Sequence, residues 1–301
     1  MTTLHRVADP LDTAEPVAVA RPEGDRSIGA LLIDAGKLKA EDAERVLRLQ
    51  REQGLRFGDA AKSLGLITDA DIEQALLRQF DYPYLTTGQS AVHASVVAAY
   101  QPFSPQVEAL RALRSQLMLR WFDSSAEQKT LAVVSPGRNE GRSWVVANLG
   151  VVFSQLGERT LIIDADLRQP RQHQLFGVDN KAGLSAFLSG RGSPDIVQRV
   201  PALQDLSVLP AGTVPPNPQE LLARPAFAQL LAQLASEFDV ILLDTPAGSL
   251  FADGQTIAVR ASGALMVARL HMARLNLVRS YADMLRQAGA TMVGSVLNEK
   301  P

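Results

Sequence analysis

Between residues 129 and 299, short runs of apolar residues alternate with stretches of helical pattern. The apolar runs lie at residues 131–135, 160–164, 206–210, 240–244, 264–269 and 292–298. Continuous apolar strands that are separated by helices are typical of a parallel sheet covered by helices on both faces. We therefore predict an α/β fold for this part of the chain, with any ligand at the carboxyl ends of the strands.

The chain before residue 104 has a different character. Residues 1–25 mix prolines with polar residues and show no periodicity, which predicts a flexible tail. From Ile28 the sequence repeats itself at an offset of 29 residues, with six identities over 23 aligned positions, and each copy has the pattern of two helices joined by a glycine turn. We predict a small all-helical domain at 26–85, a linker at 86–103 and the α/β domain at 104–301.

Composition excludes several classes of protein. A net charge of −2 gives no field that would attract nucleic acid or an anionic membrane. The absence of cysteine excludes disulfides, thiolate metal sites and thiol catalysis, so any metal would have oxygen ligands. No stretch reaches the ~18 apolar residues of a membrane span, and we expect a cytoplasmic protein.

A loop of small and polar residues, SPGRNEGRS at 135–143, follows the first predicted strand and opens directly into a helix. Gly141 and Ser143 match the phosphate-binding pattern G-x-x-x-x-G-K-[ST]. Pro136 stands at its first glycine and Arg142 at its lysine. Backbone N–H groups in such a loop bind phosphate, and arginine keeps the positive charge although it is longer and planar. The alternative is a plain strand-to-helix turn.

Carboxylates follow two further strands. The second predicted strand ends in Asp164-Ala165-Asp166, and the strand at 240–244 ends in Asp244. Each one alone is explained as a helix cap or a loop residue. Together with the loop they predict a nucleotide site in which oxygen ligands hold Mg²⁺.

These motifs, with the runs LIIDADLRQPRQHQLFG, VLPAGTVPPNPQELL and VILLDTPAG, resemble the bacterial tyrosine kinase family that regulates extracellular polysaccharide chain length, over roughly residues 104–299. The match is closest to exopolysaccharide chain-length-determinant tyrosine kinases, which are similar in carrying an extra N-terminal domain. The resemblance implies a P-loop ATPase sheet of the deviant Walker type, ATP and Mg²⁺ as cofactors, and transfer of the γ-phosphoryl group to tyrosine.

The resemblance also implies roles for individual residues. Asp164 and Asp166 would help to hold the metal and to orient or deprotonate the attacking phenol, while Arg142 would face the phosphates. The metal ligands would be Ser143, Asp164 and Asp244. The nucleotide would contact Gly137, Arg138, Asn139, Glu140, Gly141, Arg142, Ser143 and Trp144, with Asn298 reading the base.

Assembly and partners are implied in the same way. Glu108, Arg111 and Arg114 match the family's E-x-x-R-x-x-R pattern, which is associated with packing kinase domains into a ring; the alternative is a solvated helix face with local ion pairs. A membrane-spanning chain-length determinant would hold the protein at the inner face of the cytoplasmic membrane.

The sequence departs from the family in two respects. Such kinases usually end in a tyrosine cluster, whereas the acceptor candidates here are Tyr82, Tyr84 and Tyr100, and Tyr281 is expected to be packed. Arg142 in place of lysine makes catalysis less secure than binding. A nucleotide-dependent switch that transfers phosphate poorly is therefore the alternative function. A membrane-positioning ATPase is disfavoured because Gly137 stands where such proteins usually have a second lysine.

The N-terminal repeat resembles the N-terminal domain of type II secretion ATPases, some of which bind cyclic di-GMP. Arg56, Gly58 and Gly65 would take part in such binding, since arginine stacks on guanine and glycine N–H groups approach phosphate. The alternative is a helical docking domain whose glycines form turns.

Overall fold

The computed structural model describes residues 27–79, 84–86, 88–125, 128–192 and 196–299. The chain divides into two units, Met1–Tyr82 and Pro83–Pro301. The predicted tail at 1–25 and the acceptor candidate Tyr82 lie outside the described residues.

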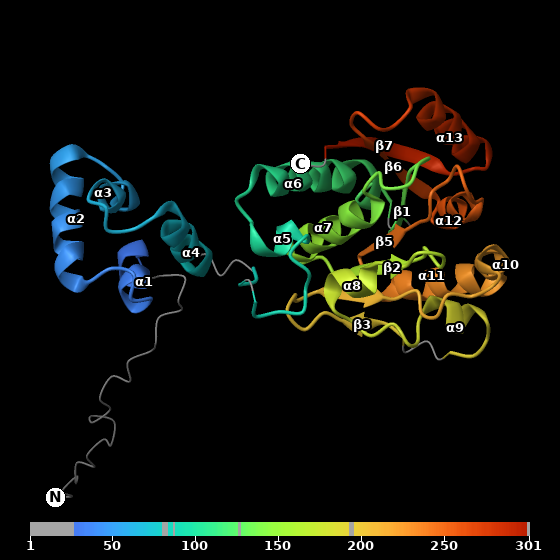
Figure 1. The fold of residues 1–301 in the computed structure, drawn as a ribbon, viewed down its shortest axis with the longest axis horizontal. Coiled ribbons are helices and arrows are strands. Elements are labelled where there is room, and N and C mark those ends of the chain that lie inside the picture. Colours follow the sequence, from blue (N-terminus) through green and yellow to red (C-terminus); the bar gives the residue numbers. More distant parts are fainter. Residues whose placement is uncertain (1–26, 80–83, 87, 126–127, 193–195, 300–301) are drawn as a thin grey trace, which may run out of the picture. The chain divides into compact units, whose positions relative to one another are not determined.

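The N-terminal unit consists of two helix–turn–helix copies, as the repeat predicts. Its helices are α1 (Ile28–Asp34), α2 (Ala40–Gln53), α3 (Phe57–Ser63) and α4 (Asp69–Gln79) (Figure 1). Gly36 and Gly65 both have a φ of +68°, a left-handed conformation that other residues adopt only at a cost. Buried side chains from the four helices, among them Leu32, Val46 and Ala60, form one small core.

The second unit is built on a seven-stranded sheet. Its strands are β1 (Thr130–Val134), β2 (Thr160–Asp164), β3 (Gln198–Arg199), β4 (Leu206–Leu209), β5 (Val240–Asp244), β6 (Gly263–Arg269) and β7 (Thr291–Asn298). Their order is β3-β4-β2-β5-β1-β6-β7, and every neighbouring pair is parallel except β3 with β4. This confirms the predicted α/β fold with a mostly parallel sheet.

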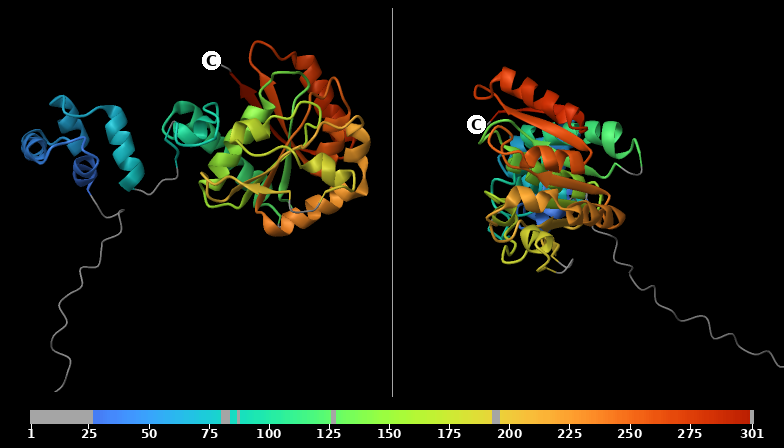
Figure 2. Two further views of the ribbon diagram at one scale, coloured as in Figure 1. Left: turned by 60° about the horizontal axis from the view of Figure 1, so that its bottom comes forward. Right: turned by 90° about the vertical axis from the view of Figure 1, so that its right-hand side faces the viewer.

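Helices cover both faces of this sheet (Figure 2). One face carries α5 (Val97–Tyr100), α6 (Pro105–Leu117), α7 (Arg142–Ser154) and α8 (Gln172–Phe176), and the other carries α9 (Leu184–Leu188), α10 (Pro218–Ala223), α11 (Pro225–Glu237), α12 (Asp253–Arg260) and α13 (Leu275–Gln287). In β1, Leu131 and Val133 enter one core while Ala132 and Val134 enter the other. This division explains the unbroken apolar runs, because each strand needs apolar side chains on both faces.

The predicted linker at 86–103 differs from the structure, because most of this segment packs on the α/β unit. Val96, Ala98 and Ala99 are fully buried in the core that contains α7. The N–H of Ala98 donates to Oδ1 of Asn148 in α7 at 2.9 Å. Gly88 and Pro102 in this segment suggested a break, but the small apolar residues between them are buried against α7.

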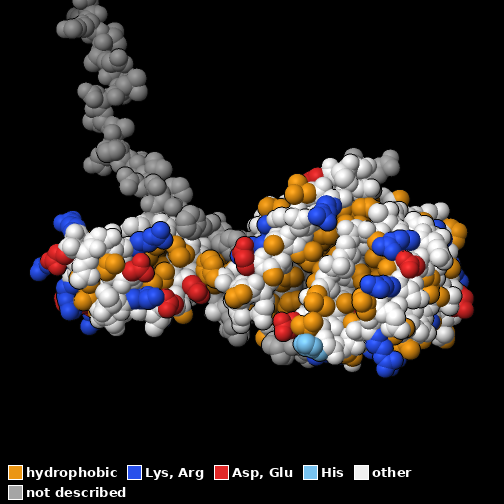
Figure 3. All heavy atoms as spheres, turned by 90° about the horizontal axis from the view of Figure 1, so that it is seen from above, with side chains coloured by type: hydrophobic (Ala, Val, Ile, Leu, Met, Phe, Trp, Pro, Cys, Tyr) orange, Lys and Arg blue, Asp and Glu red, His pale blue; other side chains and the backbone are white. Residues whose placement is uncertain are grey.

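Charges are mixed over the surface. On the face seen in Figure 3, basic and acidic side chains lie among hydrophobic and neutral ones on both units, in agreement with the net charge of −2. Within the described ranges, none of the helices has the length and apolar character needed to cross a bilayer.

Candidate active site

The carboxyl ends of β1, β2 and β5 converge at one edge of the sheet. Because β5 lies between β1 and β2, its residue Asp244 pairs with Val133 on one side and with Asp164 on the other. The loop after β1 therefore lies beside two neighbouring carboxylates, and the structure brings together the three motifs that the sequence predicts to meet.

Glycines allow the loop at 135–141 to close tightly before α7 begins. Gly141 has a φ of +100°, and Asn139 is also left-handed at +58°. A Cβ atom on Gly141 would lie 2.0 Å from Nδ2 of Asn298, and one on Gly137 would lie 2.6 Å from Oε1 of Glu140. The loop delivers the chain to the N-terminus of α7, where backbone N–H groups lack helical partners and attract anions.

The guanidinium group of Arg142 forms hydrogen bonds with the loop and with the residue after β5. Nε donates to the carbonyl of Thr245 at 2.7 Å, and Nη1 donates to the carbonyl of Gly137 at 2.7 Å and to the hydroxyl of Ser135. These bonds fix the guanidinium plane between the loop and the end of β5. Nη2 has no hydrogen-bond partner among the described residues, so it is the nitrogen that remains for a phosphate oxygen.

Glu140 places a carboxylate inside the same loop. The residue is 3% exposed, and its Oε2 is buried without a hydrogen-bond partner in the described part of the chain. Burial raises the pKa of this carboxyl group, while hydrogen bonds from Ser135 and Gly137 and the charge of Arg142 oppose the rise. Sequence reasoning assigned Glu140 only to nucleotide contact, and no periodicity revealed that it would be buried.

Asp164 and Asp244 are both fully buried. Burial and the neighbouring Asp244 raise the pKa of Asp164 well above its usual range. Burial raises the pKa of Asp244 to about 6. Asp164 accepts hydrogen bonds from the N–H groups of Arg171 and Gln172, each at 2.8 Å, and Asp244 accepts one from the amide of Gln172 at 2.8 Å. Gln172 joins the two carboxylates, and nothing in the sequence pattern singled it out.

This arrangement fits a divalent cation with oxygen ligands. The Oδ1 atoms of Asp164 and Asp244 are both buried, and neither finds a hydrogen-bond partner in the described ranges. Ser143 supplies a hydroxyl group that hydrogen-bonds to Asp244. Two desolvated carboxylates beside each other are unfavourable as bare anions, and Mg²⁺ accepts carboxylate and hydroxyl oxygens. The loop, with its free N–H groups and Arg142, fits the phosphates of ATP.

The raised pKa values predict a pH-dependent response to Mg-ATP. Both carboxyl groups bind their protons more tightly in the folded chain than in the unfolded chain. The protonated groups therefore stabilise the fold at low pH, and this contribution is lost as the pH rises through the folded pKa, which is about 6 for Asp244. Binding of Mg²⁺ requires these protons to leave. We therefore expect the thermal stabilisation by Mg-ATP to grow between about pH 5 and about pH 8, measured by differential scanning fluorimetry.

The control for this prediction is Asp244→Asn, which cannot ionise. In this variant the increase with pH should be much smaller than in the parent chain. An equal increase in both proteins would contradict the assignment of Asp244 to the metal.

Asp166 lies nearer the surface and is 8% exposed. Its Oδ1 accepts hydrogen bonds from the N–H groups of Arg168 at 3.1 Å and Gln169 at 2.9 Å. The carboxylate thus organises the turn after β2, which is the structural role that a loop aspartate often has. It also lines a small cavity together with Arg142.

The other predicted nucleotide contacts surround the loop. Arg138 and Asn139 are exposed, and Trp144 is half-buried against the core of α7. Asn298, at the end of β7, donates from Nδ2 to the carbonyl of Glu140 at 3.0 Å. In this structure Asn298 therefore supports the loop, and its contact with a base stays a prediction.

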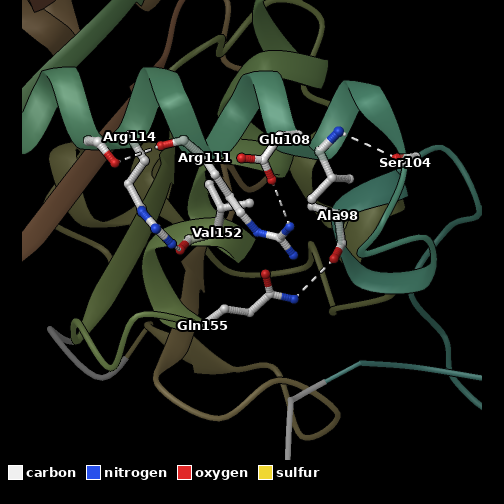
Figure 4. A network of polar contacts seen from close by, with 9 residues as sticks. Ala98, Ser104, Glu108, Arg111, Arg114, Val152 and Gln155 are labelled. Carbon is white, nitrogen blue, oxygen red and sulfur yellow. Dashed lines mark hydrogen bonds and ion pairs between the residues drawn. The ribbon is translucent and has the colours of Figure 1, made fainter. Parts of the chain in front are cut away.

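The predicted assembly residues take part in bonds within the chain (Figure 4). Nη1 of Arg111 lies 3.2 Å from a carboxylate oxygen of Glu108. Arg114 turns inward and donates from Nη1 to the carbonyl of Val152 near the end of α7 at 2.7 Å. The side chain of Gln155 donates to the carbonyl of Ala98 in the same region at 3.0 Å. Glu108 and Arg111 thus form the local ion pair that the helix-face alternative predicts. The part of Glu108, Arg111 and Arg114 in a ring stays a prediction.

The described tyrosines differ in how their hydroxyl groups are used. Tyr84 is half-buried. Tyr100 donates its hydroxyl hydrogen to the carbonyl of Val92. Tyr281 is 4% exposed, packed as expected, and its hydroxyl group has no hydrogen-bond partner among the described residues. Burial raises the pKa of Tyr281 to about 12, so its hydroxyl group stays protonated.

Two tyrosine substitutions should change stability in opposite directions. Tyr281→Phe is expected to raise the free energy of unfolding by about 1 kcal/mol, because it removes a buried hydroxyl group without a partner. Tyr100→Phe is expected to lower it by about 1 kcal/mol, because it removes a bond to Val92. Urea denaturation followed by circular dichroism measures both. A loss of stability in Tyr281→Phe would show that its hydroxyl group has a partner.

The residues suggested for cyclic di-GMP have structural explanations. Arg56 is the exposed residue at the start of α3. A Cβ atom on Gly58 would lie 3.0 Å from Cδ1 of Ile72, so this glycine permits close helix packing. Gly65 forms the left-handed turn. These features agree with the docking-domain alternative, and binding of cyclic di-GMP stays a prediction.

Comparison with known proteins gives relatives that are tyrosine-protein kinases, although no family model matches the chain. Tyrosine-protein kinase YwqD of Bacillus subtilis is 30% identical over 70% of this chain and 88% of that protein. Tyrosine-protein kinase Wzc of Salmonella typhimurium is 34% identical over 68% of this chain. The chain spans only 28% of the length of Wzc.

Solved structures that are similar to this chain include a kinase domain of the same kind. The chimerical protein CapA2B2 matches with a TM-score of 0.64 and 30% identity over 78% of this chain and all of that one. The kinase domain of the Escherichia coli tyrosine kinase Etk matches with a TM-score of 0.64 and 32% identity over 68% of this chain and 79% of that one. The septum site-determining protein MinD of Pyrococcus horikoshii, solved with Mg-ADP, matches with a TM-score of 0.50 and 25% identity over 56% and 70%.

The sheet order, the phosphate loop, the paired carboxylates and the extent of the match with YwqD agree on one assignment. The predicted resemblance is confirmed: the chain belongs to the family of bacterial tyrosine-protein kinases.

Proposed function

We propose that the protein is an ATP-dependent tyrosine kinase that acts in exopolysaccharide production. The observation that supports this most directly is the pair of buried carboxylates, Asp164 and Asp244, whose Oδ1 atoms lack partners among the described residues beside a phosphate loop. Relatives at about one third identity that are tyrosine-protein kinases add to this support.

Different residues of the site have different roles in the proposed phosphoryl transfer. Bound Mg-ATP supplies an electrophilic γ-phosphoryl group to the site. The loop N–H groups and Nη2 of Arg142 would bind and orient the phosphates, while Ser143, Asp164 and Asp244 would hold the metal. Asp166, which is nearer the surface, orients the acceptor phenol and takes its proton. Phosphoryl transfer depends mainly on such positioning and charge stabilisation, so small displacements are costly.

The test is phosphotyrosine mapping by mass spectrometry after incubation with Mg-ATP and the cytoplasmic segment of a membrane partner. We expect phosphate on tyrosine in the parent chain and none in Asp164→Asn. Clear ATP binding without transfer in the parent chain would contradict a kinase and favour the alternative, a nucleotide-gated switch that assembles on its partner. The observation that favours this alternative is Arg142, which stands where the phosphate-binding pattern has lysine.

Partners and assembly belong to the same proposal. A membrane-spanning chain-length determinant would bind the protein at the inner face of the cytoplasmic membrane, and copies would assemble into a ring through Glu108, Arg111 and Arg114. The resemblance to chain-length-determinant tyrosine kinases over residues 104–299 is what supports a partner of this kind. Analytical ultracentrifugation with the partner segment tests the ring, and Arg111→Glu should dissociate it without unfolding the chain.

The N-terminal unit adds a second candidate role, the sensing of cyclic di-GMP through Arg56, Gly58 and Gly65. The resemblance of the repeat to the N-terminal domain of type II secretion ATPases is what supports it. Isothermal titration calorimetry with cyclic di-GMP tests it in the full chain. Binding that is lost in Arg56→Ala supports the sensor, whereas no binding by the parent chain leaves the docking domain.

A further inference from the structure

The side chain of Gln172 is fully buried beside the paired carboxylates, and it comes from α8 rather than from a strand. Its backbone N–H group donates to Oδ2 of Asp164 at 2.8 Å. Its side-chain nitrogen, Nε2, donates to Oδ2 of Asp244 at 2.8 Å and to the backbone carbonyl of Ser143 at 3.1 Å. Gln172 is therefore hydrogen-bonded to each of the three residues that would hold the metal.

The two acceptors of Nε2 determine which way round the amide group of Gln172 lies. A glutamine amide has its donor hydrogens on the nitrogen, whereas an ionised carboxylate and a backbone carbonyl only accept hydrogen bonds. If the amide were turned over, its oxygen would face the oxygens of Asp244 and Ser143 at hydrogen-bond distance. The nitrogen is therefore assigned to these two residues by their chemistry, and Oε1 is the atom on the other side of the amide group.

Oε1 of Gln172 is buried and has no hydrogen-bond partner in the described part of the chain. The same is true of Oδ1 of Asp164 and of Oδ1 of Asp244. A buried polar atom without a partner is unfavourable, and in native proteins such an atom commonly meets a water molecule or an ion. Each of the three residues thus uses one side-chain atom to hold its neighbours and keeps one oxygen for something else.

The oxygen of Gln172 differs in charge from the other two. Asp164 and Asp244 are both fully buried, so a third anionic side chain beside them would add to their repulsion. An amide oxygen carries only a partial negative charge, and divalent cations accept amide oxygens as well as carboxylate oxygens. A neutral donor therefore completes the coordination of a cation without increasing the net charge of the site.

We propose that Oε1 of Gln172 is a further oxygen ligand of the divalent cation that Asp164, Asp244 and Ser143 would hold. The amide nitrogen keeps Asp244 in place, and the amide oxygen binds the cation. The inference rests on the proposed metal site and adds a residue to it. The alternative is that Gln172 acts only through its hydrogen bonds, as a residue that positions Asp244.

Two substitutions separate an oxygen ligand from a residue that only positions Asp244. Gln172→Met is similar in size and loses both the oxygen and the hydrogen-bond donor. Gln172→Glu keeps an oxygen at this position and gives it a negative charge, but it can no longer donate to Asp244 and Ser143. An oxygen ligand predicts opposite effects of the two substitutions on metal binding, whereas a positioning residue predicts a loss in both.

The measurement is the affinity of the full chain for ADP by isothermal titration calorimetry, once with MnCl₂ and once with EDTA. The ratio of the two dissociation constants is the gain in ADP affinity that the metal supplies. We expect this gain to be at least about tenfold smaller in Gln172→Met than in the parent chain. In Gln172→Glu we expect a gain at least as large as in the parent chain, because the metal also offsets the repulsion between the added carboxylate and its anionic neighbours.

Gln174 provides the matched control, since it lies in the same helix and its side chain is exposed. Gln174→Met and Gln174→Glu repeat both chemical changes outside the metal site and should leave the gain unchanged. Circular dichroism checks that every variant is folded.

A second measurement on the parent chain needs no variant. The side-chain amides of glutamine are labelled with ¹⁵N, and Mn²⁺ is added with ADP. Electron spin echo envelope modulation of the bound Mn²⁺ should show coupling to ¹⁵N, because the amide nitrogen shares a carbon atom with the coordinating oxygen. Absence of this coupling would overturn the proposal even if both variants of Gln172 failed to fold.

The outcomes also separate this proposal from the kinase proposal. An equal loss of the gain in Gln172→Met and Gln172→Glu would show that the residue only positions Asp244, and an unchanged gain in Gln172→Met would exclude it from the metal site. No gain in the parent chain would overturn the metal site itself. The expected pattern in a chain that never forms phosphotyrosine would keep the ligand and reject the kinase.

Discussion

Asp164→Asn is expected to slow phosphoryl transfer by about a thousandfold and, in the same protein, to raise the free energy of unfolding. The loss of rate follows because asparagine cannot replace the charge that holds the metal. The gain in stability follows because Asp164 is buried beside Asp244, which raises its pKa. An asparagine can still accept the N–H groups of Arg171 and Gln172 through its carbonyl oxygen, and its amide can donate to Asp244.

The gain in stability should depend on pH. The folded carboxyl group of Asp164 binds its proton more tightly than the unfolded one, so it destabilises the fold only when the pH is high enough to ionise it. The advantage of Asp164→Asn should therefore be small near pH 4 and reach on the order of 1–3 kcal/mol near pH 8.

Urea denaturation without nucleotide at several pH values, beside a phosphotyrosine assay, measures both effects. Asp283→Asn is the matched control, since Asp283 is exposed and pairs with Arg286. It should change neither quantity appreciably. A variant that loses activity and stability together would show that Asp164 mainly maintains the fold.

Arg142→Ala is expected to weaken ATP binding and transfer together, with a loss of about a hundredfold or more in kcat/KM for ATP. The substitution removes the cation and leaves the carbonyl of Thr245 without the donor that Arg142 supplies, whereas the carbonyl of Gly137 keeps the hydroxyl group of Ser135. The conservative variant Arg142→Lys keeps the charge and the bond to Gly137 but cannot bridge to Thr245 as well. We expect it to stay within about tenfold of the parent chain.

The comparison of the two variants decides what Arg142 does. ATP affinity comes from calorimetry, and transfer comes from the phosphotyrosine assay. Equal losses in both variants would show that the fixed guanidinium plane is essential, and no loss in Arg142→Ala would exclude the residue from phosphate binding. Circular dichroism must be unchanged in both, because the loop adjoins the core.

The sheet and the meeting of the three motifs could be predicted from the sequence. Every strand from β4 to β7, and β1 and β2, lies within one residue of its predicted run, because buried parallel strands need apolar residues at every position. The closeness of Asp164 and Asp244 could be predicted in the same way, because each residue ends a strand of the same parallel sheet.

Other features could not be predicted, because they depend on long-range packing. Gln172 joins both carboxylates from a short helix, and a glutamine in a polar run carries no pattern of its own. Asn298 reaches the loop only because β7 is the edge strand beside β6. The segment at 86–103 has a glycine and a proline that are typical of a linker, and only its packing against α7 explains its burial.

The pairing of β1 has a consequence for how the chain acquires its site. Thr130 in β1 pairs with Ile241 in β5, and Ala132 pairs with Ala264 in β6, so both edges of β1 pair with segments that are synthesised much later. Folds with such high contact order form slowly and expose unpaired strand edges on the way. The phosphate loop and its two carboxylates therefore assemble in one late folding step, and intermediates that lack β5 should bind no nucleotide and should be prone to aggregate.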